Sequence, residues 1–176
     1  MKIYKFAPAW ATISITLLLS SPTYTQKLSD PEVANVAVVA NQIDIAYAKI
    51  AKEKSKNADI LQFAQTMEND HKAVIDQAVA LVKKLNVMPS HSDMSKKLLA
   101  DAEETKKMLN GKSGDDFNKA YIDNEVSYHK VVIDAVQNKL IPDAENPELK
   151  NLLEQVLTTL KTHLEHAEMV QKSLHS

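Results

Sequence analysis

The sequence predicts an all-α protein folded as a four-helix bundle, and two observations support this fold class. The chain of 176 residues has only two glycines and six prolines, and those beyond residue 25 fall where helical patterns start or stop. Between these breaks run long stretches of residues with high helix propensity. Within the stretches, apolar residues recur in alternating steps of three and four, which is the spacing of helices packed in a bundle. Four such helices make a four-helix bundle.

The first two long helices each begin at a recognisable cap. The first is expected over residues 29–55, because Ser29 and Glu32 can form a capping box at its start. The second is expected over residues 58–87, with Asn57 as its N-cap. Both helices carry an apolar face that must pack against neighbours.

A more polar segment separates these helices from the last two. Residues 92–110 predict a shorter helix that ends at Gly111. We expect it to be an accessory helix or crossover on the outside of the bundle, between the second and third long helices. The third long helix is expected over residues 113–140 and the last over residues 147–174, and the segment IPDAENP between them is expected to be a loop.

The first 25 residues have the layout of a secretory signal peptide. Lys2 and Lys5 precede an apolar run over residues 6–20, and small and polar residues follow. Cleavage near residue 25 would leave residues 26–176 as one bundle domain, periplasmic or secreted, with no stable membrane span. The apolar run is short for a span, which needs roughly 20 residues. An uncleaved anchor is the alternative.

Charge and cysteine content narrow the function classes. The chain has 21 basic and 23 acidic residues, a net charge of −2, and no basic stripe for a nucleic-acid backbone. We therefore expect no nucleic-acid partner, and the sequence does not identify a protein partner. Because the chain has no cysteine, an exported form must draw its stability from packing, a partner or a metal.

Each long helix has one potential metal ligand among the apolar residues of its inward face. These residues are Asp44, His71, His129 and His163, in helix order. Each lies within about three residues of the midpoint of its helix, so at a rise of 1.5 Å per residue they should share a layer within roughly 5 Å. Three imidazoles and a carboxylate suit a divalent metal, with zinc or iron favoured and copper also compatible.

Two further acids lie one helical turn from these histidines. Glu68 precedes His71 by three residues, which is the Glu-x-x-His pairing of di-iron bundles. Glu125 precedes His129 by four residues and is not a strict second copy. We expect both acids to be additional ligands or proton acceptors. Asp70 lies beside the inward face, where it could orient a ligand, although a solvated side chain is the commoner outcome there.

Three stretches of the sequence resemble a known family. They are FAQTMENDHKAV, DDFNKAYIDNEVSYHKVV and LKTHLEHAEMV, and they contain the motif residues Met67, Asp70 and His71, then Phe117, Tyr121 and His129, then Leu160, His163 and Leu164. Over residues 30–174 the chain resembles the exported bacterial family catalogued as domain of unknown function 4142. The resemblance implies a ferritin-like fold with a metal site, and it supplies no activity. It would put the first-helix acid of the family, usually Glu, on Asp44.

The prediction from the sequence is thus an exported helical bundle that binds a divalent metal, with no reaction assigned. Two alternatives remain. Buried histidines and acids are often satisfied by hydrogen bonds alone, so the protein could be a structural or interaction protein of the envelope with a metal-free polar layer. A ferritin-like redox enzyme is the other alternative, and it needs a second carboxylate pair bridging two irons about 3.5–4 Å apart.

Overall fold

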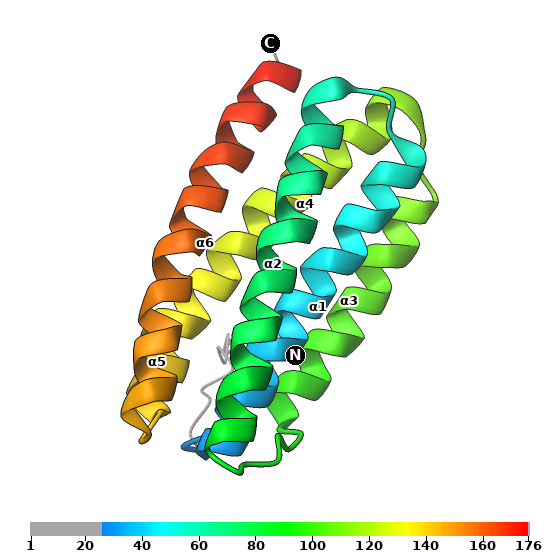
Figure 1. Ribbon diagram of the computed structural model, residues 1–176. Helices are drawn as coiled ribbons and strands as arrows, with labels where there is room; N and C mark the ends of the chain where they lie inside the picture. Colours follow the sequence, from blue (N-terminus) through cyan, green and yellow to red (C-terminus); the bar gives the residue numbers. More distant parts are fainter. Residues whose placement is uncertain (1–25, 176) are drawn as a thin grey trace, which may run out of the picture.

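The computed structural model describes residues 26–175, which form a bundle of four long helices (Figure 1). The four are α1 (Asp30–Lys54), α2 (Ala58–Lys84), α4 (Gly114–Ala135) and α6 (Pro147–Leu174). Helix α1 runs antiparallel to α2 and packs mainly on it, and α4 pairs in the same way with α6. The all-α four-helix bundle is confirmed.

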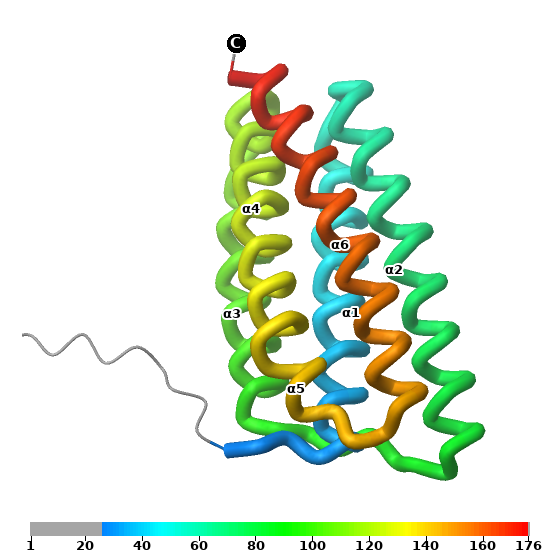
Figure 2. Tube along the Cα trace, turned by 90° about the vertical axis from the view of Figure 1, so that its left-hand side faces the viewer, coloured from blue at the N-terminus to red at the C-terminus, as the bar shows by residue number. Residues whose placement is uncertain are grey.

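The accessory helix is α3 (Asp93–Asn110), and it lies where the sequence places it, between the second and third long helices. Helices α2 and α4 run in the same direction, and α3 returns the chain along the length of the bundle between them (Figures 1 and 2). It packs against α1 and, less closely, against α4. One long crossover in an otherwise antiparallel bundle is the ferritin-like connectivity.

The predicted helix starts form as expected. The Glu32 carboxylate accepts a hydrogen bond from the Ser29 amide at 2.9 Å. The side chain of Asn57 accepts two backbone amides of the first turn of α2, at 3.0 and 3.1 Å. Asn146 caps α6 in the same manner. These caps satisfy amides that the first turn of a helix leaves without a partner.

Helix α2 ends earlier than its apolar pattern predicts, at Lys84 rather than at Val87. Asn86 has a φ of 53°, in the left-handed region. Asparagine is one of the few residues that tolerates this conformation, and it commonly ends a helix there. The conformation of this turn therefore ends the helix before its apolar pattern stops.

The end of the third long helix also differs from the expectation. The last five residues of the expected helix form a π-helical segment, η1 (Val136–Leu140). Helical structure then continues past Leu140 as a short turn, α5 (Ile141–Asp143), where the loop was expected to begin. The Ile141 amide donates to the carbonyl of Val136, five residues earlier. The next residue, Pro142, has no amide hydrogen, and its ring clashes with the carbonyl four residues before it in a regular helix. The wider π turn accommodates this proline.

The predicted signal peptide, residues 1–25, lies outside the described residues. Its cleavage and the domain boundary at residue 26 therefore stay predictions. Among the described helices, none has a stretch long and apolar enough to cross a bilayer.

Candidate metal centre

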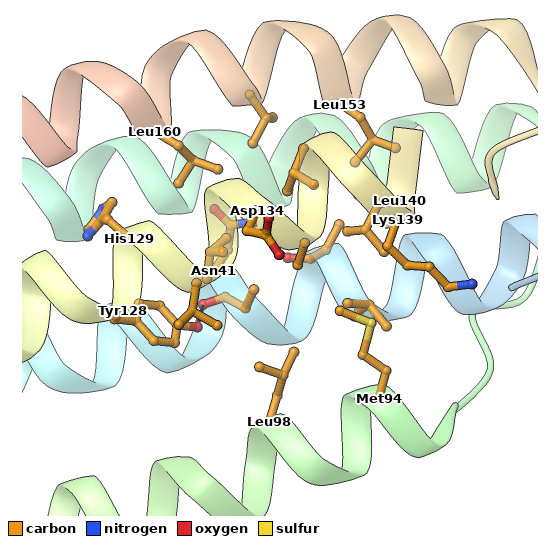
Figure 3. Close-up of a pocket in the computed structure, with 18 of the residues that line it drawn as sticks. Asn41, Met94, Leu98, Tyr128, His129, Asp134, Lys139, Leu140, Leu153 and Leu160 are labelled. Carbon is orange, nitrogen blue, oxygen red and sulfur yellow. Dashed lines mark hydrogen bonds between the residues drawn. The ribbon is translucent and has the colours of Figure 1, made fainter. Parts of the chain in front are cut away.

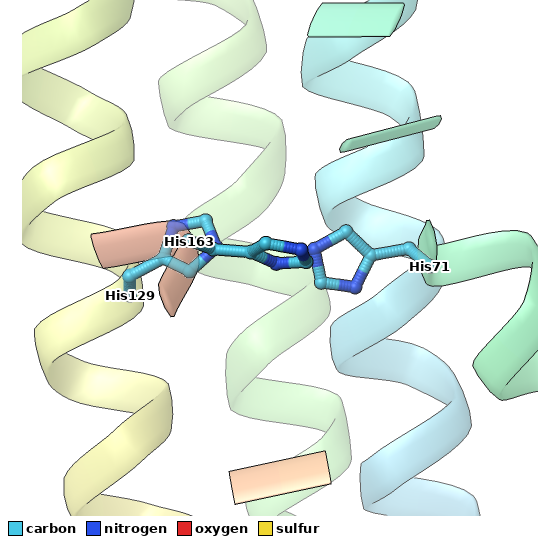
Figure 4. A group of neighbouring side chains, drawn as sticks. All are labelled: His71, His129 and His163. Carbon is cyan, nitrogen blue, oxygen red and sulfur yellow. The ribbon is translucent and has the colours of Figure 1, made fainter. Parts of the chain in front are cut away.

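Three histidines from three different helices converge in the middle of the bundle (Figure 4). His71 comes from α2, His129 from α4 and His163 from α6, and all three are buried. Their ring centroids are 5.1, 5.6 and 5.9 Å apart. One nitrogen of each ring lies within 4.8 Å of the others. The common depth expected from the helix midpoints is therefore the depth at which these side chains meet.

Asp44 joins this histidine layer from α1 and is fully buried. Its Oδ2 atom lies 3.3 Å from Nε2 of His71 and 3.6 Å from Nε2 of His129. With Glu125 and His129 it forms a second group whose ligand atoms lie within 4.8 Å of one another. All four predicted layer residues are thus brought together, each from a different long helix.

The outer nitrogen of His71 is fixed by an asparagine. Nδ1 of His71 lies 2.6 Å from Oδ1 of Asn41. The amide nitrogen of Asn41 donates to the carbonyl of Ala37 at 2.7 Å, which sets the orientation of the amide. Oδ1 must therefore accept, and Nδ1 of His71 donates. In the neutral ring this tautomer leaves a lone pair on Nε2.

The other two histidines have the same arrangement with different partners. Nδ1 of His129 lies 2.9 Å from the backbone carbonyl of Glu125, so this nitrogen donates. Nε2 of His163 donates to the Asp70 carboxylate at 3.0 Å. The neutral rings then hold their lone pairs on Nε2 of His129 and Nδ1 of His163.

The atoms that carry these lone pairs have no hydrogen-bond partner among the described residues. They are Nε2 of His71, Nε2 of His129 and Nδ1 of His163, and both oxygens of Asp44 are in the same condition. Leaving a buried polar atom unpaired costs about 1–3 kcal/mol, so such atoms are uncommon and call for an explanation. A histidine whose outer N–H is held by an acceptor while its inner nitrogen faces a shared space is the usual arrangement of a metal ligand.

Burial and charge favour the protonation states that a metal needs. Burial lowers the pKa of His129 and of His163 below the usual range, which keeps both rings neutral. Burial alone would raise the pKa of Asp44, but the positive charge that the facing imidazoles carry when protonated, His71 first, outweighs it and lowers the pKa. A bound cation would take over this role. Neutral imidazole and ionised carboxylate are the forms that bind metal.

The two additional acids have different positions. Glu125 points inward, fully buried, with Oε2 at 3.7 Å from Nδ1 of His129. Burial, followed by the charge of Asp44, raises its pKa well above the usual range, and both of its carboxyl oxygens lack hydrogen-bond partners in the described structure. Glu125 is therefore held as a neutral acid at the edge of the layer.

Glu68 does not join the layer, in contrast to the sequence expectation. Its two carboxylate oxygens contact Lys52 of α1 at 2.8 Å and Lys72 at 2.5 Å. Hydrogen bonds from Lys52 and then Lys72 lower its pKa to about 2. The lysines hold this carboxylate on the α1–α2 side of the bundle, away from the histidines, so the Glu-x-x-His spacing does not place it beside a metal here.

Sequence reasoning missed one residue and undervalued another. Asn41, which fixes the ring of His71, lies one helical turn before Asp44 on the same face of α1, and that spacing was the available signal. Asp70 was expected to be solvated more often than not, yet it is the partner that holds His163. Both side chains contact the outer nitrogen of a histidine. Apolar periodicity shows which residues face inward, and it does not show which polar side chain such a nitrogen will meet.

Comparisons with known proteins agree with this fold. The family described as domain of unknown function (DUF4142) matches residues 19–170. Among solved structures, the chain is similar to "CopM in the Cu(II)-bound form", with a TM-score of 0.62 and 13% sequence identity, over 84% of this chain and 99% of that one. At that identity the likeness shows a shared helical fold alone. No curated protein matches the chain.

Proposed function

This chain belongs to the family described as domain of unknown function (DUF4142), and we propose that it is an exported protein that binds a divalent metal ion in the middle of its bundle. His71, His129 and His163 are the nitrogen ligands, and Asp44 supplies a carboxylate oxygen. Glu125, a neutral acid in the metal-free protein, is a reserve ligand beside them. The proposal is a binding function, and it includes no reaction.

One observation supports it above the others. Each of the three imidazoles donates its outer N–H to a protein acceptor, and each inner nitrogen is buried without a hydrogen bond. That of His71 faces the Asp44 carboxylate at 3.3 Å. A polar layer held by hydrogen bonds alone would pair these inner atoms, because unpaired buried atoms are costly. The arrangement therefore favours a metal ion over the metal-free structural layer.

The redox-enzyme alternative receives less support. A di-iron centre of the ferritin-like kind needs carboxylates from each pair of helices. Glu68, which would supply one of them, is engaged by Lys52 and Lys72 instead. The remaining donor set is rich in nitrogen and suits a mononuclear ion.

Three metals fit this donor set. Zinc accepts three histidines and one oxygen ligand in a tetrahedral arrangement. Copper(II) binds N/O sites most tightly of the divalent first-row ions, and a copper-bound protein shares the fold. Iron(II) suits imidazole and carboxylate as well. Elemental analysis distinguishes among the three ions.

Elemental analysis of protein purified without chelator tests the proposal. We expect about one equivalent of zinc, copper or iron per chain in the wild type, as for other His-rich sites. His71→Ala and His163→Ala should lose most of it. His91→Ala is the matched control, because His91 is exposed and lies in the connection between α2 and α3, outside the histidine layer.

Two results would overturn the proposal. One is a wild type that carries no stoichiometric metal and cannot be loaded with any of the three ions. The other is an unchanged metal content in both layer variants, given circular dichroism that shows they remain helical. Loading should also raise the melting temperature of the wild type and of His91→Ala, because a ligand that binds only the native state stabilises it.

Export is the second part of the proposal, and the basic and apolar N-terminal residues support it. The intact mass of protein recovered from the periplasm of a bacterial host tests it. Loss of about 25 residues is the expected result for a cleaved signal of ordinary length. A full-length, membrane-associated product would identify the apolar run as an anchor instead.

A further inference from the structure

A cavity of about 440 Å³ opens into the bundle between α1, α3 and the α4–η1 segment, and α6 forms its far wall (Figure 3). Its volume falls within the roughly 300–1,000 Å³ of small-molecule sites. Helix α1 packs more closely on α2 than on α4, and α3 lies outside, against both α1 and α4. The accessory helix therefore serves as one wall of this cavity as well as a connection.

The walls of the cavity are mostly aliphatic, although the lining also includes Asn41, Tyr128, Asp134 and Asn138. Val36 contributes from α1, Met94 and Leu98 from α3, and Leu153 and Leu160 from α6. Figure 3 shows Met94 and Leu98 on one side and the two α6 leucines on the opposite side. Such walls favour a hydrocarbon body, because burying apolar surface is worth about 25 cal/mol per Å².

The two ends of the cavity are polar and differ in kind. At the inner end it is lined by His71 and His129, two of the proposed metal ligands. At the rim the charged side chains are paired, Lys97 with Asp101 at 2.6 Å and Lys139 in an ion pair of 2.9 Å. Asp134 also lines the cavity, and its carboxylate accepts a hydrogen bond from the Asn138 amide at 2.7 Å. The lining lysines and aspartates therefore carry no net charge, and the attraction for a charged group lies at the inner end.

The π-helical segment forms part of the same cavity. Val136, Lys139 and Leu140 of η1 all line it. A π turn costs stability relative to a regular helix, and such turns occur frequently at functional sites, where the extra residue re-aims side chains. The π segment thus presents these three side chains to one opening. Its position is a second reason, independent of volume, to treat the cavity as a ligand site.

We propose that this cavity binds one unbranched aliphatic monocarboxylate, with its chain along the apolar walls and its carboxylate at the metal ion. The position of the carboxylate rests on the proposed metal site, whereas the position of the chain rests on the cavity alone. The ligand would reach the layer past His71 and His129, the two proposed metal ligands that line the cavity.

Length and charge select this ligand class. The cavity extends from His129 to Lys139, ten residues apart, or about 15 Å of helix, which is close to an extended chain of about ten carbons. Three neutral imidazoles and the Asp44 carboxylate around a divalent ion leave one net positive charge. A single carboxylate neutralises it, and burying an uncompensated charge is expensive.

Calorimetric titration of the zinc-loaded protein with sodium decanoate tests the inference. The wild type should bind about one decanoate per chain, saturably, as a pocket of this size predicts. Ala135→Phe and Ala37→Phe place a phenyl ring in the cavity from opposite walls, and each should weaken binding by at least about tenfold, through lost volume. Both alanines are half-buried and line the cavity.

Ala80→Phe is the matched control, because Ala80 is exposed on α2 and does not line the cavity. It should bind decanoate as the wild type does. Absence of saturable binding to the wild type overturns the inference. The inference is also overturned if both cavity variants bind decanoate as tightly as the wild type does, provided that their helicity and melting temperature match those of Ala80→Phe.

A second comparison separates this inference from the proposed metal site. Metal should strengthen decanoate binding by at least about tenfold, and it should leave binding of 1-decanol, which has the same chain and no charge, unchanged. In cobalt-loaded protein, decanoate but not decanol should alter the visible absorption of the metal. Equal decanoate binding with and without metal overturns the placement of the carboxylate while metal uptake stands. A chain that takes up no metal yet binds decanoate, sensitive to Ala135→Phe, instead overturns the proposed function and that placement together.

Discussion

The two halves of the bundle, on either side of the histidine layer, are filled in different ways. The half near Gly111 is packed with large side chains that have no exposed surface, among them Phe63, Phe117 and Tyr121. The rings of Phe117 and Tyr121 stack with centroids 6.1 Å apart. The opposite half is lined by aliphatic residues such as Leu153 and encloses the cavity.

The difference suggests a division of labour between stability and binding. Protein cores are packed to crystal-like density, so a half filled with aromatic side chains fixes the positions of its helices. The histidines and Asp44 lie at the border of this half, and its dense packing holds them in place. The other half is less densely packed, and its cavity lies beside the same residues. The proposed metal site would need fixed ligands on one side and access on the other, and the two halves are arranged to meet both needs.

The largest expected effect comes from removing the same side chain in each half. Leu109 and Leu153 are both buried, one in the packed half and one on the cavity wall. Leu109→Ala should cost about 4 kcal/mol of unfolding free energy, because a new cavity forms in dense surroundings, and Leu153→Ala only about 2 kcal/mol. Urea denaturation of the metal-free proteins measures both. Equal losses would show that the cavity half is as tightly packed as the other.

The next effect concerns the outer partners of the histidines. Asp70→Asn weakens the acceptor that fixes Nε2 of His163, so it should lower metal affinity by about 10–100-fold. Asp76→Asn is the matched control, since it removes an exposed carboxylate from the same helix. Competition with a chromophoric chelator measures both affinities. If the two variants bind metal equally, the Asp70 contact has no part in the site.

The sequence could predict the fold and the members of the layer for one physical reason. Apolar periodicity and caps determine which helix face turns inward, and a helix midpoint determines depth. Asp44, His71, His129 and His163 follow from these two rules. Glu68 satisfies the same rules and still fails to join the layer, because Lys52, from another helix, draws its carboxylate away. Such long-range pairs are not visible in spacing.

The cavity was also beyond the reach of the sequence. It depends on how far α1 and α4 stand apart and on how α3 covers them, which are properties of assembled helices. Its one local signal is Pro142, which follows the π segment and cannot continue a regular ladder of hydrogen bonds. Sequence patterns therefore predicted the members of the histidine layer better than the space beside them.

The pH dependence of the metal-free protein should reveal the buried groups at the border of the two halves. Burial lowers the pKa of His129 and His163, so the unfolded chain binds more protons than the native state as pH falls below about 6.5. Glu125 has the opposite sign, because its raised pKa means that stability falls as pH rises above about 4.5. Each group contributes about 1.4 kcal/mol per pH unit within its window.

Between about pH 4.5 and about pH 6.5 the two histidines increase stability with rising pH by more than Glu125 decreases it, whereas above this range only the decrease from Glu125 remains. The free energy of unfolding of the metal-free protein should therefore be highest at about pH 6.5. Urea denaturation from pH 5 to pH 8 measures the profile. Glu125→Gln should remove the decline above the maximum and keep the decline below it. A profile that rises steadily to pH 8 in the wild type would contradict the assignment of Glu125 as a neutral buried acid.

The smallest effect is expected for Glu68→Gln, and it tests where the border of the layer runs. The carboxylate of Glu68 serves two lysines at the outside of the bundle, and ion pairs of this kind contribute about 1 kcal/mol or less. The substitution should therefore leave metal content and affinity unchanged and lower the unfolding free energy slightly at pH 7. Because Lys52 and Lys72 depress the pKa of Glu68 to about 2, this difference should shrink as pH falls below the ordinary glutamate range.

Glu125→Gln, one turn from His129 and inside the layer, is the natural comparison under the same metal titration. A loss of metal on Glu68→Gln equal to that of His71→Ala would mean that Glu68 turns inward when the ion binds, and the boundary drawn between inward and outward acids would then be wrong.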